Sequence, residues 1–148
     1  MNAVLREIAV FMANRDTRAP FDPLQVRAGL LPYFYVLEVG HDAAGRIRLR
    51  VRLTGTALDR AFGRPLRGQF MEDFLHGPRS HDVLRGFHTC ARDRVPLWMR
   101  QVVAIHDRLP RYVEGVAFFV EPDRIYGGLI MGEVANPIDH PGFESRLL

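Results

Sequence analysis

Lysine is absent from this sequence, and all 20 basic residues are arginine. This excludes enzymes that form a Schiff base with a lysine and phosphate-binding loops that depend on one. Cysteine is nearly absent too, because Cys90 is the only one. A single cysteine cannot form a disulfide within the chain or anchor a multi-cysteine zinc or iron–sulfur site.

Long apolar runs are also missing. No segment approaches the roughly 18 consecutive apolar residues of a membrane helix, and the N-terminal residues have neither a basic leader nor a small-residue cleavage site. We therefore expect a cytoplasmic protein without a membrane partner. The 148 residues, 47% of them hydrophobic, suffice for one domain with its own core but not for a sensor joined to an enzymatic module.

The first 14 residues predict an amphipathic helix, because apolar residues recur at helical spacing. These residues are Val4, Leu5, Ile8, Phe11 and Met12. Either the domain's own sheet or the same helix of a second subunit must cover them, and we expect a homodimer. The chain then divides into this helix with a loop (residues 1–20), a domain (residues 21–135) and a C-terminal tail (residues 136–148).

Five segments dense in apolar, β-branched and aromatic residues predict strands: 31–39, 46–54, 97–105, 112–120 and 125–134. Between the second and third, residues 56–62 predict a short helix, residues 70–75 a short turn, and residues 80–94 a longer helix capped by Ser80. This order predicts an α+β fold, a five-stranded antiparallel sheet with helices on one face. We expect disorder in the tail.

The second predicted strand alternates strictly between two kinds of residue. Arginines at positions 46, 48, 50 and 52 alternate with Ile47, Leu49, Val51 and Leu53. Successive side chains of a strand point to opposite faces, so we expect the four arginines on one face and the four apolar residues on the other.

The end of this strand carries closely spaced glycines in a fixed pattern. Arg52-Leu53-Thr54-Gly55-Thr56 is followed by Phe62-Gly63, Leu66 and Gly68. The pattern resembles the signature of the small bacterial PAS-like (Per-Arnt-Sim) family, in which an Arg-x-x-Gly-Thr strand end leads into a Phe-Gly turn and a second glycine. The resemblance extends more loosely over residues 20–134, where Glu114 resembles an acidic residue early in the family's fourth strand.

The resemblance implies a PAS-like fold and a sensory or regulatory role in signal transduction. It carries over no catalytic residue, so we expect a non-catalytic domain that binds a small-molecule ligand or a signalling protein. Domains of this kind often dimerise through a flanking helix and the outer face of the sheet, which agrees with the homodimer expected above.

Four residues are candidates for binding a ligand. Arg52 matches the family motif; we expect it to turn toward the helices and to pair with Asp59, Asp73 or Glu114, since a buried arginine needs a carboxylate. Trp98, Phe118 and Tyr126 lie in the last three predicted strands, whose inner face would line a pocket in a PAS fold. Alternation alone does not say which face is inward.

Other functions have weaker support in the sequence. The arginines of residues 46–52 could follow phosphates, which makes a regulatory nucleic-acid-binding protein the alternative, although no aromatic residues interleave with them. His81 and His88, seven residues apart on one helix, are the only argument for haem. Cys90 lacks the Asn-Cys-Arg context of flavin photoreceptors, and no metal-ligand spacing occurs. We expect no cofactor.

Overall fold

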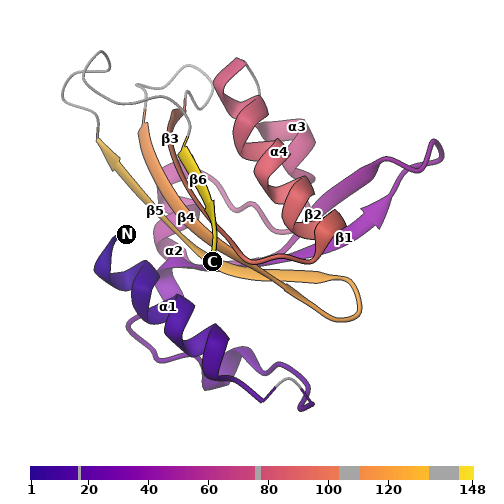
Figure 1. Cartoon of the computed structure of the whole chain (residues 1–148). Coiled ribbons are helices and arrows are strands. Elements are labelled where there is room, and N and C mark those ends of the chain that lie inside the picture. Colours follow the sequence, from indigo (N-terminus) through magenta and orange to yellow (C-terminus); the bar gives the residue numbers. More distant parts are fainter. Residues whose placement is uncertain (17, 76–77, 104–110, 134–143) are drawn as a thin grey trace.

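The computed structural model describes residues 1–16, 18–75, 78–103, 111–133 and 144–148 (Figure 1). Its elements are α1 (Ala3–Asn14), the short 3₁₀ helices η1 (Pro23–Gln25) and η2 (Leu31–Tyr33), β1 (Phe34–His41), β2 (Ile47–Thr54), α2 (Thr56–Phe62), α3 (Met71–Phe74), α4 (Pro78–Asp93), β3 (Leu97–Val103), β4 (Arg111–Val120), β5 (Arg124–Glu133) and β6 (Glu144–Leu147). The predicted α+β class is confirmed, and the helices predicted at residues 56–62 and 80–94 are observed as α2 and α4. The turn predicted at residues 70–75 contains the one-turn helix α3. No helix of this part of the chain is long and apolar enough to cross a membrane.

The sheet is antiparallel and has six strands in the order β2-β1-β5-β4-β3-β6. The prediction of five strands is therefore wrong, because residues 144–147 of the expected tail pair with β3. β6 has only four residues, too few for alternation to reveal it, and its pairing with β3 defines it as a strand. The hairpin predicted at 106–110 lies outside the described residues.

Helices cover both faces of the sheet. Helices α2, α3 and α4 pack on one face, where Leu37, Leu49 and Val51 are buried. Helix α1 packs on the other face, where its Leu5 and Ile8 are fully buried among sheet residues. Figure 1 shows α1 and α4 on opposite sides of the strands. The chain's own sheet thus covers α1, whose apolar residues do not need a second subunit to bury them; the homodimer stays a prediction.

A β-bulge interrupts the alternation of β2. Val36 pairs with Leu53, but the next residue, Leu37, pairs with Val51, so Arg52 is an extra residue in the ladder. The extra residue reverses the facing of the two residues after it: Leu53 packs with the core on the α1 side, and Thr54 reaches the side of α2–α4. The prediction that Leu53 shares a face with Leu49 and Val51 is therefore wrong.

Two of the three glycines in the motif, Gly55 and Gly63, occupy positions where a larger residue fits poorly. A β-carbon on Gly55 would lie 2.1 Å from the backbone oxygen of Leu31. Gly63 ends α2 in the left-handed conformation, with φ 74°.

Ser80 does not cap α4 as predicted. The helix begins at Pro78, and the buried Ser80 hydroxyl has no hydrogen-bond partner among the described residues.

Candidate functional site

A small cavity lies between the sheet and helices α2–α4. Its volume is about 50 Å³, and its walls come from residues far apart in the sequence. The sheet contributes mainly Leu37, Val51, Val113 and Leu129, and α4 contributes Val83 and Phe87. These are aliphatic and aromatic side chains, so the cavity can exclude water and favours an apolar occupant.

The segment from α2 to the residue after α3 forms one wall of the cavity, which we call the roof. The roof contributes Leu58, Phe62, Leu66, Met71, Phe74 and Leu75. The rings of Phe62 and Phe74 meet edge to face, with their centres 5.5 Å apart. Because most of these side chains are buried, the roof is held against the sheet chiefly by the apolar contacts that line the cavity.

The two polar residues in the cavity wall are already engaged. The Tyr35 hydroxyl donates to the backbone oxygen of Val116 at 2.7 Å, and the Thr54 hydroxyl donates to Asp59 Oδ1 at 2.5 Å. Burial raises the pKa of Tyr35 well above its ordinary value, with a smaller contribution from Cys90, so its proton stays in place. The wall therefore offers an occupant no unused side-chain donor.

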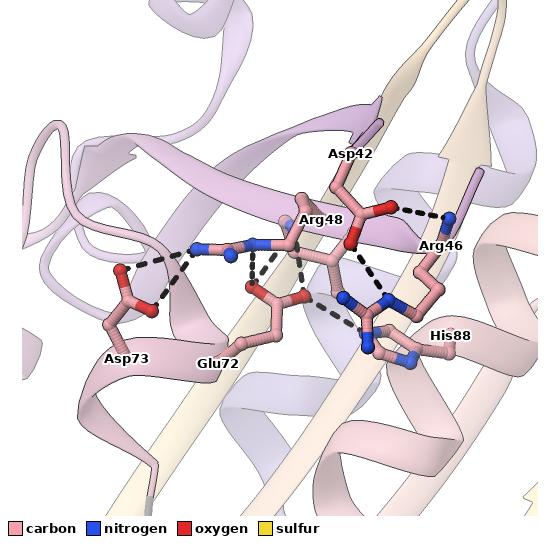
Figure 2. Close-up of polar contacts among 7 residues, drawn as sticks. Asp42, Arg46, Arg48, Glu72, Asp73 and His88 are labelled. Atoms are coloured by element: carbon pink, nitrogen blue, oxygen red, sulfur yellow. Dashed lines mark hydrogen bonds and ion pairs between the residues drawn. The ribbon is translucent and has the colours of Figure 1, made fainter. Parts of the chain in front are cut away.

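A polar cluster lies at the outer rim of the roof (Figure 2). The Glu72 carboxylate accepts the backbone N–H of Leu49 at 3.0 and 3.2 Å, and its Oε1 lies 3.0 Å from His88 Nε2. Arg48 Nε is 3.6 Å from the same carboxylate, and its terminal nitrogen reaches Asp73 at 3.1 Å. Glu72 thus connects α3 to β2 and to α4.

The hydrogen bonds to Glu72 keep it ionised. Burial alone would raise the pKa of this carboxyl group, but the hydrogen bonds from His88, from its own backbone N–H and from Leu49 outweigh burial. The pKa of Glu72 is consequently lowered. A carboxylate that accepts several donors at once is a strong hydrogen-bond acceptor, which suits it to joining three elements.

The structure does not place Arg52 as predicted. Its guanidinium is half exposed and pairs with Glu38 of β1 at 2.7 Å, and not with any of the three expected carboxylates. Those carboxylates have other partners: Asp59 accepts from Thr54, Asp73 from Arg48 and Glu114 from Trp98. Because Glu38 lies on the neighbouring strand, only the pairing of β1 with β2 reveals it as the partner.

Trp98, Phe118 and Tyr126 lie on the side of the sheet that α1 covers. The structure brings these three together with α1, and neither they nor Arg52 line the cavity between the sheet and α2–α4. Sequence reasoning missed Tyr35, Val113 and Phe87 as cavity residues. Alternation along each strand separates its residues into two faces, but the sequence pattern does not say which of the two faces packs against α4.

The remaining candidates do not form a chemical site. Burial raises the pKa of Cys90 to about 12, so it remains a thiol inside the core. His88 bonds to Glu72 at the rim and is not part of the cavity wall. Within the described ranges, no group of three or more His, Cys, Asp or Glu residues could hold a metal ion.

No protein-family model matches this sequence, and neither a curated protein nor a solved structure matches it. The resemblance to the PAS-like family therefore depends on the glycine motif and the order of the elements.

Proposed function

We propose that this chain is a non-catalytic PAS-like sensory or regulatory domain that binds an apolar small molecule between its sheet and helices α2–α4. One observation carries the proposal: a cavity lined by aliphatic and aromatic side chains, in which both polar wall groups are already hydrogen-bonded within the protein. Such a wall favours a ligand that itself needs few hydrogen bonds, because any polar group of the ligand would lose its water without compensation.

The motif and the element order support a PAS-like assignment. Gly55 lies where η2 and α2 approach each other closely, and Gly63 adopts the left-handed conformation at the end of α2. Both positions favour glycine, which is consistent with a fixed sequence signature. Two strands, then helices, then further strands follow the order that the resemblance implies. Signalling is then the role of the domain, with ligand binding as its input.

The size of the cavity bears on the ligand. Sites for drug-sized ligands typically measure about 300 Å³ or more, whereas this cavity measures about 50 Å³. A ligand of more than a few heavy atoms must therefore displace part of the wall. The observed arrangement of sheet and roof is accordingly the closed form of the proposed sensor.

The cavity wall also supports a role without catalysis. General acid–base catalysis requires a group that titrates near the working pH, within hydrogen-bond reach of the reacting atoms. The titratable residue of the wall is Tyr35, whose pKa is raised by burial and whose hydroxyl is bonded to a backbone oxygen.

The arginines of β2 give the nucleic-acid alternative less support than the sequence did. Arg46 pairs with Asp42, Arg48 with Asp73, and Arg52 with Glu38. Guanidinium groups that already face carboxylates attract phosphates less strongly. A phosphate would either have to displace the carboxylate or be repelled by its negative charge. We therefore retain ligand binding as the proposed function.

Binding of 1-N-phenylnaphthylamine, an uncharged aromatic probe that fluoresces in apolar surroundings, tests the proposal. We expect saturable binding to the parent protein and its loss in Val83→Phe, since Val83 lies in the cavity wall. Val10→Phe is the matched control, because Val10 is exposed on α1. Equal binding by both variants, or none by the parent, would contradict the proposal.

Native mass spectrometry of protein purified from its own host tests the same point with the natural ligand, which would appear as a mass increment.

A further inference from the structure

The outer edge of the sheet at β2 is closed by the chain that leads into α3. The backbone N–H of Val51 donates to Gln69 at 2.8 Å, and Gly68 donates back to Val51 at 2.7 Å. Two residues earlier on the same edge, the N–H of Leu49 has no such backbone partner and is bound by the Glu72 carboxylate. A side chain thus provides the acceptor that a neighbouring strand would otherwise provide.

Glu72 and Asp73 are adjacent but have different roles. The Glu72 side chain is 18% exposed and bonds to β2 and α4, whereas the Asp73 side chain is 63% exposed and pairs with Arg48. Both are drawn in Figure 2, where Glu72 lies between Arg48 and His88. Of the two, Glu72 alone joins three elements and is the less exposed, so the two residues form a natural test pair and control.

Helix α3 is a single turn, Met71–Phe74, which is too short to be stable without tertiary contacts. Its inward side chains, Met71 and Phe74, line the cavity, while Glu72 on its other side makes the polar connection to β2 and α4. Movement of α3 would therefore open the cavity at the edge next to β2, and that movement requires Glu72 to release Leu49 and His88.

We infer that Glu72 is the latch of the cavity: its hydrogen bonds to Leu49 and His88 hold α3 closed, and a ligand enters when they break. This inference rests on the proposed function, because a latch regulates entry only if the cavity binds a ligand. The alternative is that Glu72 is one of several contacts that stabilise the whole domain, with no local opening of α3.

Residue-resolved amide hydrogen exchange tests the latch without any ligand. In Glu72→Ala we expect the amides of Leu49 and Val51 to exchange roughly tenfold faster or more, the size expected for losing a hydrogen bond to a charged acceptor. Amides of the central strand β5 should keep the parent's rates. Asp73→Ala, the matched control, should leave Leu49 unchanged. If Glu72→Ala does not fold, Glu72→Gln keeps the side-chain volume and one acceptor and should give the same local pattern with a smaller factor.

Unchanged exchange at Leu49 and Val51, or an equal acceleration of all amides including those of β5, would overturn the latch.

Stopped-flow mixing with 1-N-phenylnaphthylamine then measures the rate of ligand entry. We expect the association rate to rise in Glu72→Ala and to match the parent in Asp73→Ala. Local exchange without any probe binding would support the latch and contradict the proposed function. Probe binding with parental exchange and entry rates would contradict the latch alone.

Discussion

The indole N–H of Trp98 donates to Glu114 Oε1 at 2.8 Å, and the same oxygen accepts the backbone N–H of Asn2 at 2.9 Å. Glu114 is buried on β4, and Asn2 is the residue immediately before α1. A single carboxylate thus joins β3, β4 and the start of α1. It anchors this helix to the sheet at a point where the apolar contacts of Leu5 and Ile8 begin.

Glu114 makes stability depend on pH. Burial acts to raise its pKa, but the hydrogen bonds from Trp98 and Asn2 outweigh burial, and the pKa is lowered. A carboxyl group with a lowered folded-state pKa stabilises the fold fully above its unfolded-state pKa of about 4.3. That contribution is lost as the pH falls through the folded-state value. We expect urea unfolding of the parent to show this loss and Glu114→Gln to show a smaller one, because other carboxylates with a lowered pKa, such as Glu72, keep their own contribution. Glu121→Gln, at an exposed position, should behave as the parent.

Replacement of Trp98 by phenylalanine keeps an aromatic ring but removes the N–H donor to Glu114. We expect a loss of about 1 to 3 kcal/mol in the free energy of unfolding, the range for a hydrogen bond to a charged group plus reduced packing. In a Glu114→Gln background the same replacement should cost less. A double-mutant cycle with no coupling would show that the indole acts through packing alone.

Gly55 allows η2 and the start of α2 to approach closely. A β-carbon there would lie 2.1 and 2.3 Å from the backbone oxygens of Leu31 and Pro32. We expect Gly55→Ala to reduce the free energy of unfolding by about 1 to 3 kcal/mol, because backbone atoms must move. Gly29→Ala is the control, since nothing lies within 4 Å of its added carbon. Equal melting temperatures for the two variants would contradict this account of the motif.

The packing of α1 on its own sheet predicts the effect of a charge at Ile8. This residue is fully buried, so Ile8→Glu should destabilise the domain by on the order of 3 kcal/mol. Val10→Glu, on the exposed side of the same helix, should change stability little. Light scattering of the parent tests the predicted homodimer separately. Dissociation of a dimer by Ile8→Glu without loss of stability would contradict packing within one subunit.

The sequence by itself determined the α+β class and the order of α1, β1, β2, α2, α4 and β3 to β5. Helical spacing identified α1 and α4, and short apolar runs between turn residues identified β1 to β5, because these periods are local properties of the chain. The motif contains Gly55 and Gly63, and the structure shows that a larger residue fits poorly at both. At Gly55 the reason is a contact with Leu31, which lies well before it in the sequence.

Only the tertiary structure decided which face of each strand is inward. Alternation separates Trp98 from Leu97 and Met99 but gives both sets a reason to be buried, because helices cover both faces of this sheet. The bulge at Arg52 then exchanges the faces of Leu53 and Thr54, and strand pairing makes Glu38 the partner of Arg52. The contacts of Glu72 likewise depend on the tertiary structure. They form because folding brings α3 and α4 next to Leu49 of the edge strand β2, and no local sequence pattern shows which residues will meet there.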